Sequence, residues 1–218
     1  MFVETLASLL RFYTDEPDQT VETDANVAMW LYLAYDDFRS TVAEIDPTIY
    51  TVSHDMSVTG SGFIELNGVL LGPSPTQPRL DTLLDITVIE GGSETRRWRA
   101  GTVIDDVIHG NADYALIGTR LRVPETTTAS IRIYYLPTQS INWAGGLAAG
   151  SNVYVDELHR FHDVIPRLAY LQYAVLDAAN HPQLMMLLQR RQEQLRNYLF
   201  SRGGPASSEV VDSRWMEP

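Results

Sequence analysis

Two histidines spaced three residues apart are the first candidates for binding a metal ion. His159 and His162 have Glu157 and Asp163 beside them, and positions i and i+3 share one face of an α-helix, so two imidazoles could reach one ion. A zinc site needs three or four protein ligands, and on a helix Asp163 would point about 100° away from His162. The sequence therefore favours two solvated histidines on the polar side of a helix, and no metal ligand is predicted.

Two further groups contain residue types used in acid–base or nucleophilic catalysis. Asp105, Asp106 and His109 could exchange protons with a substrate, but adjacent carboxylates point to different sides of a helix, and the stretch begins like a capped helical turn. The tripeptide Ser53–Asp55 contains the residues of a catalytic triad, which is assembled in space and not from neighbours in a strand. No catalytic residue is predicted, and a small hydrolase using Asp105, Asp106 or the histidines is the least favoured alternative.

The densest cationic cluster is formed by Arg96, Arg97, Trp98 and Arg99. On a β-strand, Arg97 and Arg99 would share one face and Trp98 would lie on the other. The cluster is a possible interface patch for phosphate or for an acidic partner surface, although an ordinary half-exposed strand has the same pattern and is favoured. The sequence has no GxxxxGK[ST] motif and no lysine, so no phosphate-binding loop and no cofactor are predicted.

Length and composition are typical of one medium-sized globular protein. The chain has 218 residues, of which 44% are hydrophobic, and a mean hydropathy of -0.13. The absence of cysteine excludes disulfides and thiolate metal sites. No apolar stretch approaches the roughly 20 residues that cross a bilayer, so no membrane partner is expected.

Charge is distributed unevenly along this acidic chain, whose net charge is -12. Residues 1–57 contain eleven acidic residues and two arginines, whereas residues 153–202 contain five acidic residues and six arginines. Binding of nucleic acid through counterion release needs clustered cations, so specific DNA binding is not expected. All sixteen basic residues are arginine, which is compatible with a GC-rich genome or with a high-salt environment that favours acidic proteins.

Two helices are predicted at the start of the chain. Residues 2–13 form a short amphipathic helix, and a longer helix runs from a cap at Thr23 or Asp24 to about Ile45. The predicted inner face of the longer helix is Val27, Trp30, Leu31, Ala34, Phe38, Val42 and Ile45.

Between the terminal helices the hydrophobic period changes from 3.6 to 2, which predicts strands. The predicted strands are residues 50–52, 57–59, 63–66, 83–90, 95–100, 111–116, 118–123 and 129–135. A short helical turn is predicted over residues 103–109.

A helical hairpin is predicted at the end of the chain, over residues 153–202. Its first helix opens with Asp156–Glu157, which suits the positive end of a helix dipole, and His181–Pro182 interrupts the helical run. Its apolar residues recur at spacings of three and four, as Leu158, Phe161, Ile165, Leu168, Leu171, Val175 and Leu176.

The last residues, Gly203–Pro218, have the composition of a flexible tail. Val210, Val211, Trp215 and Met216 are its apolar residues, and they form a candidate docking element for a neighbouring protein. A disordered end with a stray aromatic residue is the alternative.

The predicted fold class is α+β, in which N- and C-terminal helices pack as a helical body with an antiparallel β-rich insertion. The predicted parts are an N-terminal helical part (1–49), the β-rich insertion (50–137), a connector with the helical hairpin (138–202) and the flexible tail (203–218).

Several aromatic and apolar motifs occur in an order that resembles one known protein family. The helix with Asp24, Trp30, Leu31, Ala34 and Tyr35 matches a pattern D-x5-W-[LI]-x2-A-Y. The segments 113–124, 131–137 and 158–166 are similar to a strand pair, a Tyr-Tyr-x-x-Pro strand and a closing helical hairpin. Together these motifs, which extend from Leu6 to Leu199, resemble the head–tail adaptor (connector, or neck) proteins of tailed phages. The family commonly has asparagine where this chain has Leu33, which is a departure.

The resemblance implies a structural role and not an enzymatic one. Members of this family form a homo-oligomeric ring, usually of twelve subunits, beneath the portal protein of the capsid, and connect the portal to a downstream neck or tail protein. DNA would pass through the channel without specific binding, because an acidic ring repels it. The expected location is the neck of the virion, after synthesis in the host cytoplasm.

A different virion tail component is the main alternative. In a tail-completion or receptor-contacting module, the strand-rich part would bind a glycan or another protein.

Overall fold

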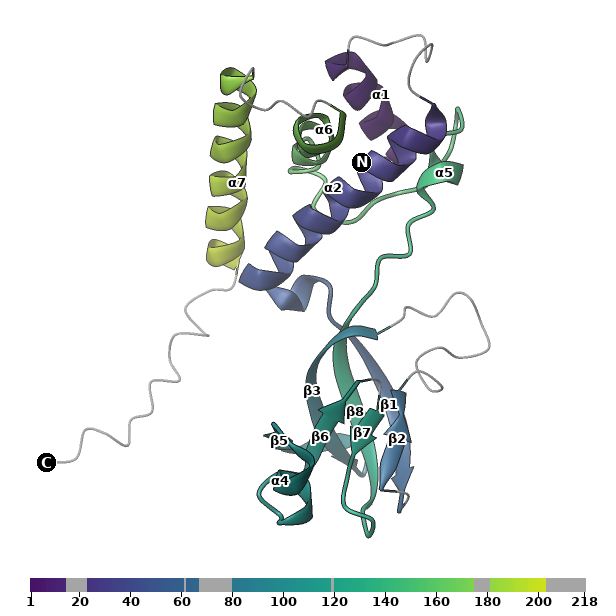
Figure 1. The fold of residues 1–218 in the computed structure, drawn as a ribbon, viewed down its shortest axis with the longest axis vertical. Helices are drawn as coiled ribbons and strands as arrows, with labels where there is room; N and C mark the ends of the chain where they lie inside the picture. The colour runs from purple at the N-terminus through teal and green to yellow at the C-terminus, as the bar shows by residue number, and fades with distance from the viewer. Residues whose placement is uncertain (15–22, 61, 67–79, 119, 175–180, 203–218) are drawn as a thin grey trace, which may run out of the picture. The chain divides into compact units, whose positions relative to one another are not determined.

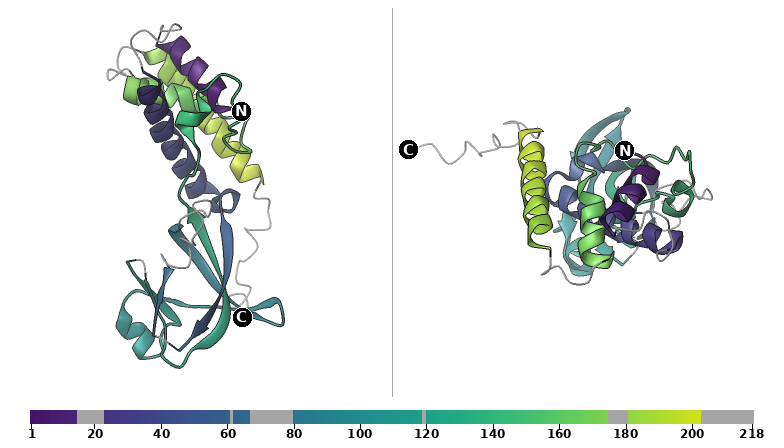
Figure 2. Two further views of the ribbon diagram at one scale, coloured as in Figure 1. Left: turned by 90° about the vertical axis from the view of Figure 1, so that its right-hand side faces the viewer. Right: turned by 90° about the horizontal axis from the view of Figure 1, so that it is seen from above.

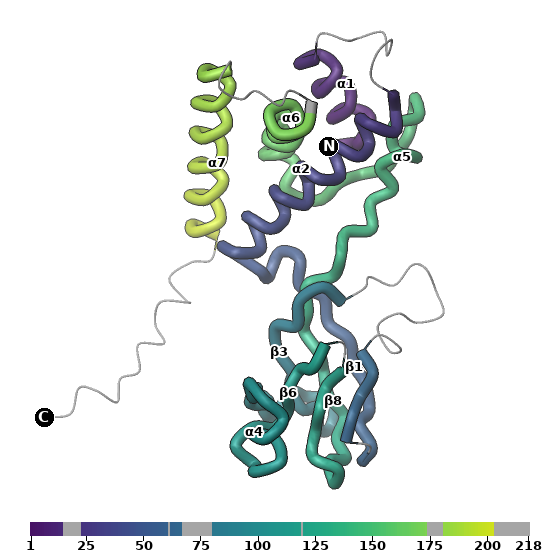
Figure 3. The backbone as a smooth tube through the Cα atoms, in the orientation of Figure 1, coloured from purple at the N-terminus to yellow at the C-terminus, as the bar shows by residue number. Residues whose placement is uncertain are grey.

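The computed structural model describes residues 1–14, 23–60, 62–66, 80–118, 120–174 and 181–202. The chain divides into two compact units, which can be followed in Figures 1 and 3. The first, called here the helical unit, consists of Met1–Ile49 and Ile141–Pro218, and the second, the strand unit, is Tyr50–Ser140. The two ends of the chain therefore build one unit, and the strand unit is an insertion in its sequence.

The helical unit opens with two helices whose apolar faces are buried. Helix α1 spans Val3–Tyr13 and α2 spans Asp24–Ile45. The Thr23 side chain caps α2 by accepting a hydrogen bond from the backbone N–H of Asn26. As predicted, one side of α2 is buried, through Val27, Ala28, Leu31, Ala34, Tyr35, Phe38 and Val42. Trp30 and Ile45, which were predicted on this side, are only half-buried.

The first closing helix begins later than predicted. Residues 153–163 contain turns and one isolated β-bridge, and helix α6 spans only Val164–Ala169 before a π-helical segment, η2, over Tyr170–Ala174. The prediction of a helix from Val153 is therefore wrong. Pro166 explains the late start, because a proline inside a longer helix would leave the carbonyl of residue 162 without its N–H donor and would clash with it.

An extended segment replaces the missing part of that helix. The N–H of Val3 donates to the carbonyl of Val153 at 3.0 Å, and the rings of Phe2 and Tyr154 meet edge to face at 5.9 Å. This segment thus joins the start of the chain to its closing part. The short helix α5, Trp143–Gly146, adds a buried indole to the same core.

The last helix, α7, spans Pro182–Arg202 and lies at one side of the helical unit (Figure 2). It begins at the proline predicted to interrupt the helical run. Of its residues, Leu188, Leu195 and Leu199 are buried. Two positions of the predicted apolar stripe, Val175 and Leu176, lie outside the described residues.

The described residues of the strand unit form two four-stranded sheets, with strand orders β1-β8-β3-β4 and β2-β7-β6-β5. All pairs are antiparallel except β5 and β6, which are parallel. The strands are β1 Val52–Thr59, β2 Phe63–Glu65, β3 Leu80–Glu90, β4 Ser93–Arg97, β5 Ala100–Gly101, β6 Tyr114–Ile117, β7 Arg120–Arg122 and β8 Thr128–Pro137.

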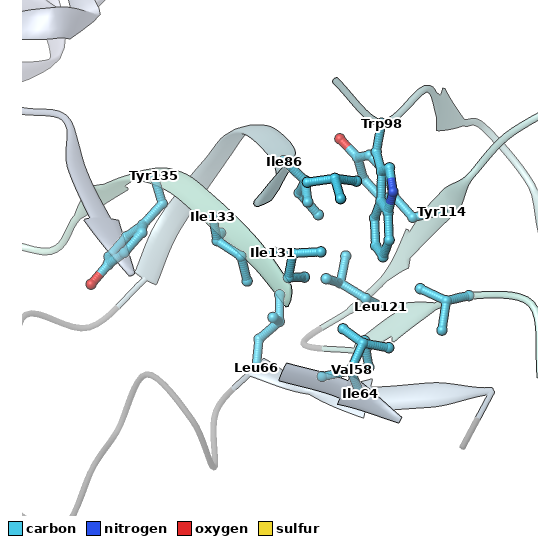
Figure 4. Close-up of a cluster of buried hydrophobic side chains, with 12 residues drawn as sticks. Val58, Ile64, Leu66, Ile86, Trp98, Tyr114, Leu121, Ile131, Ile133 and Tyr135 are labelled. Carbon is cyan, nitrogen blue, oxygen red and sulfur yellow. The ribbon is translucent and has the colours of Figure 1, made fainter. Parts of the chain in front are cut away.

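One apolar core fills the space between the two sheets, as Figure 4 shows. The chain passes from the first sheet to the second twice, once from β1 to β2 and once from β4 to β5. Gly60 and Gly62 make the first passage with positive φ angles of 43° and 71°, which disfavour residues with a side chain. Strand β1 is one continuous strand, whereas two shorter strands were predicted over residues 50–52 and 57–59.

The predicted α+β class is confirmed, with helices from both chain ends and an inserted antiparallel β-rich part. Within the described ranges, no helix is both long and apolar enough to cross a membrane. The tail, with its candidate docking residues Val210, Val211, Trp215 and Met216, lies outside the described residues.

Candidate interaction surfaces

The two histidines considered as metal ligands have different surroundings. His162 is 0% exposed, and its Nε2 lies 2.5 Å from Oδ1 of Asp156. His159 is exposed, and its Nδ1 lies 3.1 Å from the carbonyl oxygen of Glu157. The prediction of two solvated histidines on one helix is therefore wrong for His162. Its position depends on the turns before α6, which the sequence pattern did not predict.

Asp156 and His162 fix the closing segment of the helical unit. The Tyr35 hydroxyl, from α2, donates to Oδ2 of Asp156 at 3.0 Å, and the N–H of Leu158 donates to Oδ1 at 2.7 Å. The imidazole also lies edge-on to the Phe38 ring, 6.3 Å between centroids. Since the imidazole is fully buried, a substrate cannot reach it, and the cluster is a structural connection between α2 and the segment before α6.

The carboxylates considered for acid–base chemistry stabilise a helix start. The predicted helical turn is present as α4, Ile104–Ile108. The Asp106 carboxylate accepts hydrogen bonds from the N–H groups of Val103 and Thr102, and these bonds hold its pKa below the ordinary value. His109 Nδ1 lies 2.8 Å from the backbone oxygen of Asp105. In the part of the chain that the structure describes, no three acidic or histidine side chains could hold a metal ion.

The Ser53–Asp55 tripeptide lies in β1, where its side chains alternate between the two faces of the sheet. Arg132, opposite Asp55 on β8, donates to both carboxylate oxygens at 2.6 and 2.9 Å, and to Glu94 at 2.9 Å. The Tyr134 hydroxyl also donates to Glu94. The Arg132 hydrogen bond lowers the pKa of Asp55, and the Tyr134 hydrogen bond, followed by that of Arg132, lowers the pKa of Glu94. Asp55 is thus engaged in an ion pair.

Of the possible interface patch formed by Arg96, Arg97, Trp98 and Arg99, the three arginines are exposed and Trp98 is buried. Trp98 is 4% exposed and belongs to the core of the strand unit, as Figure 4 shows. Strand β4 ends at Arg97, and the N–H of Trp98 still donates to the carbonyl of Ile86. The exposed arginines contact aspartates: Arg97 lies 2.7 Å from Asp85, and Arg96 and Arg99 each lie 3.4 Å from Asp113.

Arg191 of α7 attaches that helix to the segment before α6. Its guanidinium donates twice to Asp163, through Nε at 3.0 Å and through a terminal nitrogen at 3.0 Å, and also to the backbone oxygen of Arg160 at 2.8 Å. It lies 5.4 Å from the centroid of the Phe161 ring. The ion pair with Asp163 raises the pKa of Arg191. The sequence pattern gave no sign of this attachment, because it joins residues almost thirty positions apart.

Two adjoining hollows, both lined by Arg191, lie at this attachment and have volumes of about 550 and 360 Å³. We call them together the arginine groove, because Arg160, Arg167, Arg190 and Arg191 line it. Asp163 is the one acidic residue among the described residues of the lining. Arg167 also lies 2.8 Å from Asp163. Among the described residues, Arg160 and Arg190 have no carboxylate within ion-pair distance, so the groove has an excess of positive charge.

Helix α7, which provides part of the groove lining, also has large exposed apolar side chains. Met186 and Phe200 of α7 are 70% and 69% exposed, and Leu187, which lines the groove, is also exposed. The strand unit has its own exposed apolar residues on and around α4 and β6, namely Val103, Ile104, Ile108, Leu116 and Ile117. Exposed groups of this kind are typical of protein interaction surfaces.

Comparison with known proteins found no protein-family model and no curated protein that matches this chain.

Proposed function

We propose that this protein is a structural head–tail adaptor of a tailed virus. The observation that carries the proposal is the discontinuous helical unit: both chain ends build it, and a β-rich part is inserted between them. This is the arrangement that the resemblance of the sequence to adaptor proteins implies. The residue types considered for catalysis support the same proposal, because Asp106, Asp55 and His162 hold the fold together.

In this proposal, copies of the chain form a ring of usually twelve subunits beneath the portal, and a downstream neck or tail protein binds the other side. The ring lies in the neck of the virion and surrounds the path of the DNA. The net charge of -12 supports passage of the DNA without binding to the protein, because a channel lined by acidic subunits repels phosphates.

Removal of Gly204–Pro218 tests the proposed docking of the tail onto the portal. We expect the truncated protein to unfold at the same temperature as the full chain and to lose binding to purified portal rings. Within the full chain, Trp215→Ala should raise the Kd for the portal about 30-fold, the effect of removing one buried aromatic anchor. Binding is measured by co-sedimentation with portal rings.

The matched control is Arg214→Ala, which changes the neighbouring residue and leaves Trp215 and Met216 in place. It should bind within about threefold of the unchanged protein, because residues around an anchor contribute little. Normal portal binding by the truncated protein would show that the tail is not the docking element. If the full chain does not bind portal rings, the adaptor function itself is wrong.

A further inference from the structure

Charge is segregated within the helical unit. The α7 side of this unit contains the arginine groove, with Arg160 and Arg190 lacking a carboxylate partner among the described residues. Helix α2 carries the opposite charge. Its exposed acidic residues are Asp24, which forms an ion pair with Arg11, and Asp36, Asp37 and Glu44, whereas Arg39 is its one basic residue. Helices α2 and α7 thus present complementary charges.

We propose that the arginine groove binds the outer side of α2 from a second copy of this chain. Asp36 and Glu44 of one copy would approach Arg190 and Arg160 of the next. This contact joins two different surfaces, so it propagates head to tail and can close into a ring. The inference deepens the proposed adaptor function, since it names the contact between neighbouring subunits of that ring.

The groove has the chemistry for binding a carboxylate. The guanidinium of Arg191 is held by Asp163, Gln194 and a backbone oxygen, so it shapes the groove and is not free to bind a partner. Arg160 stacks 5.7 Å from the Tyr198 ring centroid, and Arg190 is exposed. Arginine binds carboxylates through paired, charge-assisted hydrogen bonds.

The outer side of α2 has a matching pattern. Asp36, Ser40 and Glu44 follow each other at spacings of four residues and are exposed, so they share one side of the helix. Met29, farther toward the N-terminus, lies on this side and is also exposed. This side faces away from the buried residues around Phe38.

The two helices also agree in length and in their apolar residues. Helices α2 and α7 have 22 and 21 residues, so each is about 32 Å long at ~1.5 Å per residue. Met29 on α2 and Met186 and Leu187 on α7 would provide apolar contacts beside the charged ones. An apolar centre with complementary charges around it is the usual composition of a specific interface.

Reversing the charges separately and together tests this contact. We expect Arg190→Glu and Asp36→Arg each to weaken self-association of the full-length protein at least about 100-fold, because each places like charges opposite one another. A mixture of the two variants should restore association to within about tenfold of the unchanged protein. In the mixture, the carboxylate introduced at position 190 of one variant faces the guanidinium introduced at position 36 of the other, and the remaining contacts keep the original arginine–aspartate pair. Self-association is followed by sedimentation velocity over the accessible concentration range.

Two controls make the same charge changes elsewhere on the helical unit. Arg196→Glu lies on α7, about 120° around the helix from Arg190, and Glu157→Arg reverses an exposed acid before α6. Both should associate like the unchanged protein. Circular dichroism checks that every variant is folded, which is expected because Arg190 and Asp36 are exposed.

The proposed contact is overturned if the unchanged protein stays monomeric at every concentration, if Arg190→Glu associates normally, or if the mixture of variants fails to associate. These outcomes differ from a failure of the adaptor function. If association follows the charge pattern but the protein is absent from the virion neck, the contact is supported and the adaptor function is wrong. If the protein is present in the virion neck but association does not follow the charge pattern, the adaptor function is supported and the proposed contact is wrong.

Discussion

His162→Ala is expected to lower the free energy of unfolding of the helical unit by about 3 kcal/mol, through a cavity and the loss of a buried hydrogen bond. His162 is fully buried, contacts the Phe38 ring and lies 2.5 Å from Asp156. The effect is measured by urea unfolding followed by helical circular dichroism.

The control is His159→Ala, which removes an exposed histidine three residues away. It should change the free energy of unfolding by less than about 0.5 kcal/mol, as surface substitutions usually do. Equal effects of the two substitutions would contradict the different positions that the structure gives to His159 and His162.

Trp98→Ala is expected to destabilise the strand unit by about 3–5 kcal/mol, the range for removal of a large buried aromatic side chain. Trp98 is buried between the two sheets and contacts Tyr114, with ring centroids 6.4 Å apart. Two-dimensional NMR spectra measured during unfolding can follow the two units separately. In the variant, the signals of the helical unit should persist after those of the strand unit are lost.

Arg96→Ala is the matched control in the same stretch of chain. Its side chain is 64% exposed and its ion pair with Asp113 is long, at 3.4 Å, so the loss should stay below about 1 kcal/mol. A small effect of Trp98→Ala together with a larger effect of Arg96→Ala would contradict the burial of Trp98.

Elements with a clear period and a local stop signal could be predicted from the sequence. The bounds of α2 follow from the Thr23 cap, the spacing of its buried residues, and Asp46–Pro47 at its end. Strand β8 follows from the alternation of Ile131, Ile133 and Tyr135 with polar neighbours. In both elements, residues close in sequence decide the structure.

Prediction was less accurate where a single proline determines the start of a helix, or where contacts between residues distant in sequence determine burial. The apolar spacing around Phe161 is helical in period, yet Pro166 prevents a helix there, so the rule for proline outweighs the pattern. Burial of His162 depends on Tyr35 and Phe38, which lie more than 120 residues earlier. No local pattern reports a contact of this kind.

The candidate surfaces, too, could be predicted from the sequence only in part. The arginines of the groove are visible in the sequence as Arg190 and Arg191 in a polar run, but their grouping with Arg160 and Arg167 requires α7 to pack beside the segment before α6. Trp98 alternates with Arg97 and Arg99, a pattern that favours a half-exposed strand with Trp98 on the face opposite those arginines. The structure places Trp98 in the core of the strand unit.

The most direct test of the proposed function is cryo-electron microscopy of the virion neck, with symmetry assigned from the density. We expect a closed ring of copies of this chain directly beneath the portal, around the path of the DNA, with α7 of each copy against α2 of the next. Density for the protein in a tail fibre or at a tail tip, or its absence from the particle, would contradict the proposed adaptor function.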